Sequence, residues 1–336
     1  MRYPLFISNS DMTRIFAMCV GFILVLAASQ VVLARYLVPG EPRVELLDTY
    51  LRDGYDIIYF GDSVIDTHTS KDSDPSSIVD MLRKREAGLT IADFSRGADN
   101  LDLFELYVAY IARSPVKPSA VIVPINLRSF SPGWDLDPTG QFEKIKFYLT
   151  AQPRFLTYFY RPFAISGVIN MNEVSEAVFQ DTSVYYGKGV VGKVAQYEGR
   201  RWLSEPAAED VRDMYIYSYM PSLDSDHRKL ESLRRLVDTA KENDIEVYAY
   251  ITPVDYEGGG RYVGEDFVEQ IKENAAVVCA VLKEKSVLCL NLALNLTSEH
   301  FSHPEYPDEH LRQSGRAFVS KSVDEFFFKK SPNDSD

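Results

Sequence analysis

Cysteine is scarce in this chain, with 3 among 336 residues. So few thiols exclude a scaffold built on disulfides, and no CxxC pair or His/Cys cluster in the sequence suggests a structural metal. Basic residues are also in deficit, because 36 Lys and Arg face 49 Asp and Glu, for a formal net charge of -13. An acidic protein repels phosphate backbones, so we expect no nucleic-acid partner.

The three cysteines leave one question open. Cys279 and Cys289 are ten residues apart in the sequence, whereas Cys19 lies in an apolar N-terminal run. The first two could form one bridge in an extracytoplasmic domain. They could equally be two small buried apolar residues, because a free cysteine packs as a small hydrophobe.

Residues 15–34 carry no charge, and Arg14 and Arg35 flank them. This length is close to the roughly 20 residues that cross a bilayer, so we expect residues 1–38 to be an uncleaved membrane anchor. A cleaved signal peptide is the main alternative, because the small residues 27–29 could form a cleavage site. A buried core helix is the third reading. Positive charges lie on both sides of the segment, so the positive-inside rule does not decide its orientation.

Beyond a polar connector at residues 36–55, strand and helix patterns alternate. Short apolar runs rich in β-forming residues predict five strands, at 56–60, 89–94, 120–125, 245–252 and 286–292. Helical spacing predicts helices at 75–85, 101–111, 228–242, 267–283 and 312–328. Strands that alternate with helices are parallel, because each crossover returns to the same edge. The fold we expect is α/β, a three-layer α/β/α sandwich around a five-stranded parallel sheet.

An aromatic-rich stretch interrupts this alternation at about residues 140–225. Its densest part, Phe147–Phe163, reads FYLTAQPRFLTYFYRPF. The stretch is either core or lid, or it contacts a membrane surface or a partner, where aromatic and Arg side chains are favoured. We therefore expect one domain over residues 39–330 with this stretch as an insertion, followed by a disordered tail at 331–336.

Polar residues follow the carboxyl ends of several predicted strands. Ser63 comes directly after the first strand, Gly97 lies in the loop after the second, and Asn126 follows the third. Asp308 and His310 come after a loop that follows the fifth strand. A serine after a strand often only caps a helix, so Ser63 alone is a weak signal. The carboxyl ends of parallel strands share one rim, and the joint order predicts a site there.

These residue types suit acyl transfer. The hydroxyl of Ser63 becomes a good nucleophile only when a base takes its proton, and a histidine such as His310 is the side chain best suited to that role. The carboxylate of Asp308 could hold the imidazole in the useful tautomer. The backbone N–H groups of Ser63 and Gly97 and the side-chain amide of Asn126 could stabilise the oxyanion of a tetrahedral intermediate.

Three further residues are weaker candidates for the same site. Arg128 follows Asn126 and could bind an anionic substrate, although a surface salt bridge is the plainer reading. His68 lies five residues after Ser63 and could contact substrate. His303 is an alternative to His310 as the base.

Ser63, Gly97, Asn126 and His310, in this order, resemble the SGNH (GDSL) hydrolase superfamily over roughly residues 54–326, apart from the insertion. The resemblance implies a flavodoxin-like sheet and ester chemistry. Two motifs differ, because the third block here keeps only the Asn of Gly-x-Asn-Asp, and the last block is Asp-x-His rather than Asp-x-x-His. The Asp-x-His form and the N-terminal anchor are similar to the membrane-linked branch, which includes alginate O-acetyltransferases and the D-alanine transfer protein of teichoic acid synthesis.

The resemblance implies serine-dependent O-acyl transfer to a cell-envelope polysaccharide or glycolipid. It places the domain outside the cytoplasmic membrane, beside a membrane-bound O-acyltransferase as partner, and residues 15–34 in the bilayer. It implies no metal and no organic cofactor. Hydrolysis of the same esters is the alternative activity. A non-catalytic glycan-binding or assembly module is the third reading, which the altered block around Asn126 favours.

Overall fold

The structure is a computed structural model that describes residues 9–37, 41–131, 134, 142–150, 184–185, 188–189, 208–304, 307 and 309–329. Asp308, most of the predicted insertion and the predicted tail at 331–336 lie outside the described residues.

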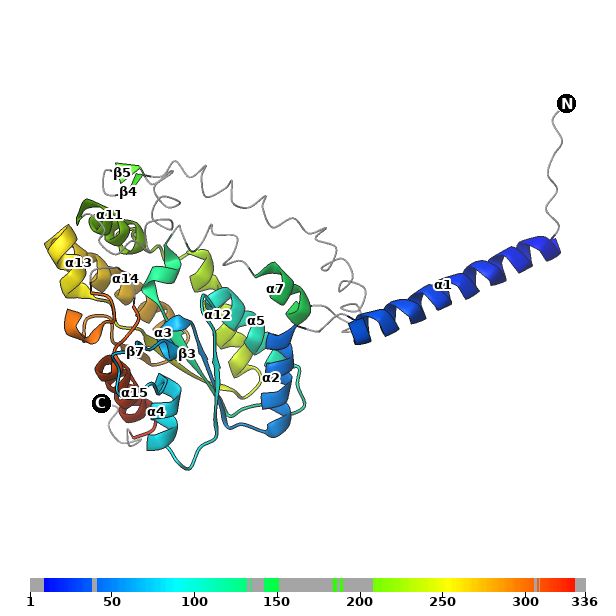
Figure 1. The fold of residues 1–336 in the computed structure, drawn as a ribbon, viewed down its shortest axis with the longest axis horizontal. Coiled ribbons are helices and arrows are strands. Elements are labelled where there is room, and N and C mark those ends of the chain that lie inside the picture. The colour runs from blue at the N-terminus through cyan, green and yellow to red at the C-terminus, as the bar shows by residue number, and fades with distance from the viewer. Residues whose placement is uncertain are drawn as a thin grey trace.

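The sheet has five parallel strands, which confirms the predicted fold class (Figure 1). The strands are β1 (Ile57–Gly61), β2 (Ile91–Ser95), β3 (Ala120–Ile125), β6 (Glu246–Ile251) and β7 (Cys289–Asn291). Their order is β2-β1-β3-β6-β7, the flavodoxin-like order, in which the chain reverses direction across the sheet between β1 and β3. Every residue of β1 and β3 is buried, because helices cover both faces of the sheet.

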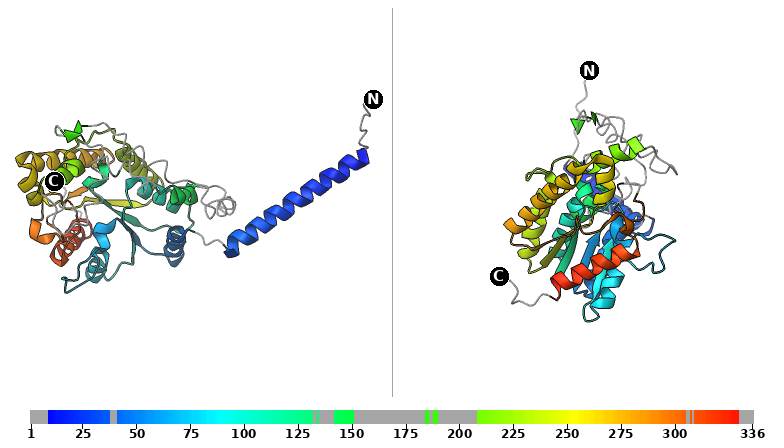
Figure 2. Two further views of the ribbon diagram at one scale, coloured as in Figure 1. Left: turned by 45° about the horizontal axis from the view of Figure 1, so that its top comes forward. Right: turned by 90° about the vertical axis from the view of Figure 1, so that its left-hand side faces the viewer.

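Helices form the two outer layers (Figure 2). One core contains the helices α2 (Pro42–Asp53), α5 (Leu101–Ala112), α12 (Arg228–Lys241) and α14 (Glu265–Glu284). The other core contains α4 (Ile78–Arg85) and α15 (Gln313–Phe327). Successive residues of β1 belong to opposite cores, as the period of two of a strand requires.

Shorter elements lie between the layers or outside them. They are α3 (Ser63–Asp66), the 3₁₀ turns η1 (Leu127–Phe130) and η4 (Ser298–His300), α13 (Tyr256–Val263), and, from the predicted insertion, α7 (Glu143–Thr150), β4 (Val184–Tyr185), β5 (Lys188–Gly189) and α11 (Ala208–Tyr219). Helix α13 was not predicted from the sequence.

Helix α2 corrects the prediction of a polar connector at residues 36–55. Val44, Leu47 and Leu51 recur at helical spacing, and all three are buried in the core. Charged residues between them hide this stripe when the segment is read by composition alone. The helix therefore belongs to the domain and begins only a few residues after the N-terminal helix.

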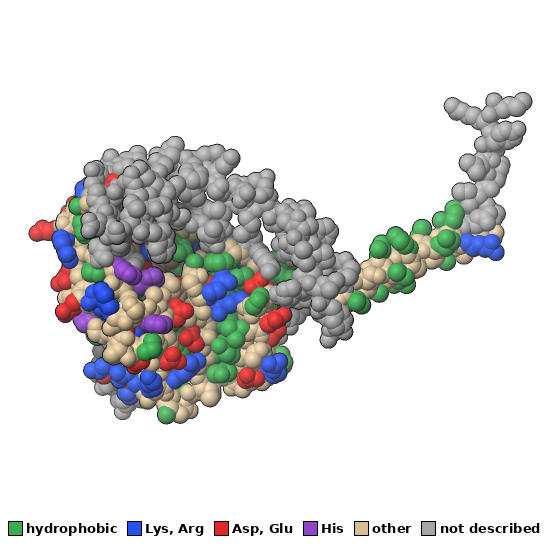
Figure 3. All heavy atoms as spheres, viewed as in Figure 1, with side chains coloured by type: hydrophobic (Ala, Val, Ile, Leu, Met, Phe, Trp, Pro, Cys, Tyr) green, Lys and Arg blue, Asp and Glu red, His purple; other side chains and the backbone are tan. Residues whose placement is uncertain are grey.

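The N-terminal helix α1 (Asn9–Leu37) is long and apolar enough to cross a membrane. Its window Met12–Ser29 has a mean hydropathy of 2.0, and none of that window is buried. Figure 3 shows its hydrophobic side chains on the surface of the helix. The reading as a buried core helix was therefore wrong.

Cys279 and Cys289 form a disulfide between α14 and the first residue of β7, with their Cα atoms 5.4 Å apart. The sequence left open whether these two cysteines form a disulfide or remain buried free thiols, and in the structure they form the disulfide. Because β7 is the edge strand and has only three residues, the bridge fixes an element that few backbone bonds hold. The remaining cysteine, Cys19, is exposed on α1.

Candidate active site

A strand, a tight turn and a short helix place Ser63 at the rim of the sheet. The strand β1 ends at Gly61, where an added Cβ would lie 2.3 Å from the side chain of Ile65, so only glycine fits beneath α3. Asp62 caps α3, because its Oδ1 accepts a hydrogen bond from the N–H of Val64 at 2.9 Å. The helix cap is therefore Asp62 and not Ser63, which answers the reading of Ser63 as a capping residue.

His310 lies against Ser63, with its Nε2 2.9 Å from the Ser63 Oγ. A short antiparallel bridge between Phe301 and Leu311 holds its loop, and the N–H of Ser302 donates to the carbonyl of His310 at 2.8 Å. The distance to Ser63 is within the range over which a base takes a proton. Asp308 lies outside the described residues, so its predicted role stays a prediction.

Asn126 is fixed by two hydrogen bonds. Its Oδ1 accepts from the N–H of Arg128, and its Nδ2 donates to the Oδ2 of Asp62, both at 2.9 Å. The second bond was not predicted, and it joins the end of β3 to the turn that carries Ser63. An amide nitrogen has two hydrogens, so the bond to Asp62 is compatible with a second bond to an oxyanion.

Gly97 lies beside Ser63 in the loop after β2. A Cβ added to Gly97 would be 4.0 Å from the Cβ of Ser63. The next residue, Ala98, has a φ of 69°, a left-handed conformation that turns the chain back toward α5. The backbone of this loop therefore approaches Ser63 closely, as the predicted role of Gly97 in an oxyanion hole requires.

A buried carboxylate, Asp99, holds the loop of Gly97 in place. Arg43 on α2 contacts Asp99 at 3.1 Å, and Arg96 and Tyr107 donate to it at 3.0 and 3.1 Å. The guanidinium of Arg43 also stacks on the ring of Phe94, 3.6 Å from its centre. The first turn of α2, which follows the N-terminal helix, is thus bonded to the loop that borders the site.

Burial raises the pKa of Asp62 to about 6. Its hydrogen bonds from Asn126 and Val64 oppose this rise, the nearby charge of Glu309 adds to it, and His310 counters it. A carboxyl group that titrates close to neutral pH therefore lies directly behind the candidate nucleophile. Perturbed carboxyls of this kind are concentrated at functional sites, although ion-pair networks also produce them.

Glu309, next to His310, was not singled out from the sequence, but it is buried at 3% exposure. Tyr219 of α11 donates to its Oε1, and the guanidinium of Arg128 lies 3.5 Å from its Oε2. The salt bridge expected for Arg128 exists, but it is buried rather than on the surface, since the Arg128 side chain is 14% exposed. Burial is the feature that makes Glu309 notable. The burial of a single acidic residue cannot be read from the sequence.

The two other histidine candidates lie further from the chemistry. His68 is exposed on the segment after α3, with its Nδ1 3.5 Å from the carbonyl of Asp66. Burial raises the pKa of Asp66, and the nearby charges of His310 and His68 partly oppose this rise, so both histidines lie near this carboxylate. His303 is exposed, and it is His310 rather than His303 that contacts Ser63. No group of three or more metal-binding side chains occurs among the described residues.

Comparisons with known proteins give a structural likeness only. No protein-family model matches the chain, and no curated protein matches it. Among solved structures, a catalytic mutant of Axe2, an acetylxylan esterase from Geobacillus stearothermophilus, is similar, with 13% identity and a TM-score of 0.39 over 81% of this chain and 93% of that chain. A second catalytic mutant of Axe2 gives 12% identity, the same TM-score and the same coverage. At this identity and TM-score the likeness does not define the activity of the chain.

Proposed function

We propose that this protein is a serine-dependent O-acyl transfer enzyme that works through an acyl-enzyme on Ser63. The observation that carries the proposal is the 2.9 Å contact between the Ser63 Oγ and the His310 Nε2. The contact joins residues 247 positions apart in the chain, and it leaves the serine hydroxyl free of helix capping. Nucleophile and base within hydrogen-bond reach are the geometric signature of covalent catalysis.

In the first half-reaction the Ser63 Oγ attacks the carbonyl carbon of an acyl ester, and its proton passes to the Nε2 of His310. The N–H groups of Ser63 and Gly97 and the amide of Asn126 stabilise the oxyanion. The intermediate collapses to acyl-Ser63, and the leaving alcohol takes the proton from His310. We assign Asp308 to the orientation of His310.

In the second half-reaction His310 takes a proton from an acceptor hydroxyl, which attacks acyl-Ser63 and releases the serine. A sugar hydroxyl as acceptor gives transfer, and water gives hydrolysis. We favour transfer to a cell-envelope polysaccharide or glycolipid, because the Asp-x-His form and the anchor resemble the membrane-linked branch. A membrane-bound O-acyltransferase would then supply the acyl group.

Two features support a location of the domain outside the cytoplasmic membrane. Helix α1 is long and apolar enough to be a single-pass anchor. The disulfide between Cys279 and Cys289 is typical of an oxidising compartment, since cytosolic thiols are kept reduced. Together they favour an anchor with the domain on the periplasmic or extracellular side.

The test uses a fluorophosphonate probe, which labels activated serines, and hydrolysis of 4-nitrophenyl acetate. Ser63→Ala should abolish labelling and lower hydrolysis on the order of 10⁴-fold, as nucleophile deletions do. Ser222→Ala, an exposed serine far along the chain from the site, is the matched control and should keep both activities. A folded Ser63→Ala protein that hydrolyses the ester as the wild type does would refute the assignment.

A non-catalytic glycan-binding module is the second candidate. The bond between the Asn126 amide and Asp62 favours it, because it uses part of a group that an enzyme would direct at the oxyanion. This candidate predicts that the wild-type chain binds envelope glycan but is not labelled by the probe. Labelling of Ser63 in the wild type would exclude it.

A further inference from the structure

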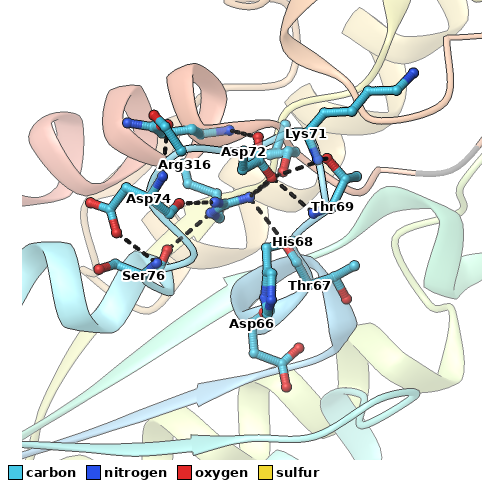
Figure 4. Close-up of polar contacts among 12 residues, drawn as sticks. Asp66, Thr67, His68, Thr69, Lys71, Asp72, Asp74, Ser76 and Arg316 are labelled. Atoms are coloured by element: carbon cyan, nitrogen blue, oxygen red, sulfur yellow. Dashed lines mark hydrogen bonds and ion pairs between the residues drawn. The ribbon is translucent and has the colours of Figure 1, made fainter.

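Arg316, in the first turn of α15, has a fully buried side chain. Figure 4 shows its guanidinium enclosed by the segment that follows α3. Its Nε donates to the carbonyl of Ser76 at 3.0 Å, and its Nη2 donates to that of Asp74 at 2.9 Å. Its Nη1 donates to the carbonyls of Thr67 and Leu311 at 3.3 and 2.8 Å. One side chain therefore joins two chain segments that are far apart in the sequence.

The charge of Arg316 is balanced by Asp72, whose Oδ2 lies 3.1 Å from its Nη1. The Asp72 carboxylate also accepts hydrogen bonds from the N–H groups of Thr69 and Gln313, at 2.8 and 3.0 Å. Burial raises the pKa of Asp72, but these hydrogen bonds and the positive charge of Arg316 outweigh it and lower the pKa to about 2. The Asp72 carboxylate is therefore ionised at neutral pH.

Both segments held by Arg316 lead directly to the candidate catalytic pair. Thr67 closes the helix of Ser63, because its N–H donates to the Ser63 carbonyl at 3.1 Å. Leu311 is the residue after His310, and its side chain is fully buried. The two sides of the contact between Ser63 and His310 are thus each bonded, within one turn of chain, to the same rigid guanidinium.

A buried ion pair is weak evidence for stability, because desolvation of the two charges offsets much of their attraction. The planar guanidinium of Arg316, with its five N–H groups, fixes the directions of several carbonyl groups at once. An apolar side chain cannot do this. We propose that Arg316, with Asp72, is a positioning pair that sets the distance and angle between Ser63 and His310. The proposal rests on the catalytic roles proposed above for these two residues.

The experiment compares Asp72→Asn with the wild type in the full-length chain in detergent. This substitution keeps the size of the side chain and removes the charge that faces Arg316. The second-order rate constant of fluorophosphonate labelling and the kcat of ester hydrolysis should fall roughly 10 to 100-fold, because a small misplacement of reacting groups costs about that much. KM should stay within about twofold, since substrate binding is not changed. A general loss of folded protein would lower the labelled fraction but not its rate constant.

Lys84→Ala is the matched control, because it removes an ion pair on the same segment, with Asp74 at 3.7 Å, whose side chains are 63% and 38% exposed. It should leave the labelling rate unchanged. A folded Asp72→Asn protein with the wild-type labelling rate would overturn the proposal. So would a rate loss of the same size in Lys84→Ala.

Gln313→Ala is the second variant, to be used if Asp72→Asn does not fold. It removes the acceptor of hydrogen bonds from Ser73 and from the N–H of Asp74 but keeps Arg316. It should lower kcat about fivefold at constant KM, and an unchanged kcat would count against the positioning role. If the wild type itself is not labelled at Ser63, the proposed function fails, and this outcome is distinct from failure of the positioning proposal.

Discussion

The variant Asp62→Asn tests how much stability the protein loses by burying the ionised carboxylate of Asp62. The Asp62 carboxylate accepts one bond from the N–H of Val64 and one from the amide of Asn126, both at 2.9 Å. An amide at this position can keep the first bond, but it presents a donor to a donor at the second. The variant therefore removes a buried titratable group and releases the Asn126 side chain.

The magnitude follows from the pKa of Asp62, which burial raises from 3.8 to about 6. A group whose pKa is higher in the folded protein contributes stability that is fully present below its unfolded pKa and is lost as pH rises through its folded pKa. The wild type should therefore lose stability through this group between about pH 4 and pH 6. The full loss is about 3 kcal/mol, taken at about 1.4 kcal/mol for each tenfold change in proton affinity, and residual solvent contact of the side chain makes this an upper value.

The assay is urea unfolding of the wild type and of Asp62→Asn at pH 4 and at pH 7, with the disulfide oxidised. The free energy of unfolding of the variant, relative to the wild type, should rise by about 2 kcal/mol between the two pH values. The bond from Asn126 is stronger to the carboxylate than to the protonated acid, and the pKa of about 6 already includes this difference. Ester hydrolysis should fall about tenfold at pH 7, because the amide of Asn126 is no longer held. A stability difference that is the same at both pH values would refute the reasoning.

Three further changes test other parts of the structure. Asn126→Ala should lower kcat about 10² to 10³-fold with little change in KM, because an oxyanion donor acts mainly in the transition state; a loss confined to KM would make Asn126 a binding residue. Glu309→Gln removes the buried negative charge that faces Arg128 and should lower the free energy of unfolding by about 3 kcal/mol in urea melts, so a change below about 1 kcal/mol would show that the pair is dispensable. Cys279→Ser opens a short loop and should cost about 2 to 3 kcal/mol in the same melts without changing kcat, and a loss of activity in folded protein would contradict this.

The positions of the strands along the chain could be predicted, because the sequence pattern of each strand is local. β1 and β3 are continuous apolar runs bounded by glycine or polar residues, and such runs are typical of a sheet covered on both faces. The helix α13 could not be predicted, because its sequence YEGGGRYV contains three glycines. The structure gives the reason for two of them, since a Cβ on Gly258 would lie 2.5 Å from the hydroxyl of Tyr215 and a Cβ on Gly259 would lie 2.0 Å from the ring of Phe267. Gly259 allows close packing of α13 on α14, which a local pattern does not reveal.

Some features of the candidate site could likewise be predicted from the sequence, and others could not. The rim where Ser63 and His310 meet could be predicted, because topology alone brings the carboxyl ends of parallel strands together. The bond between Asn126 and Asp62 and the burial of Glu309 could not, since each depends on side-chain packing between distant segments. Arg316 is the extreme case, because its acceptors on the segment after α3 lie about 240 residues earlier in the sequence.

The bond between Arg43 and Asp99 limits the distance between the end of α1 and the candidate site. Only six peptide steps separate Leu37, the last residue of α1, from Arg43, so this connection spans at most about 20 Å. Asp99 in turn is two residues from Gly97, whose backbone lies beside Ser63. For a chain anchored through α1, Ser63 would stay within a thin layer of space next to the bilayer. Under the proposed function, acceptor groups within that layer would meet Ser63 at a high effective concentration, and distal parts of a long glycan would escape modification until they returned to the membrane surface.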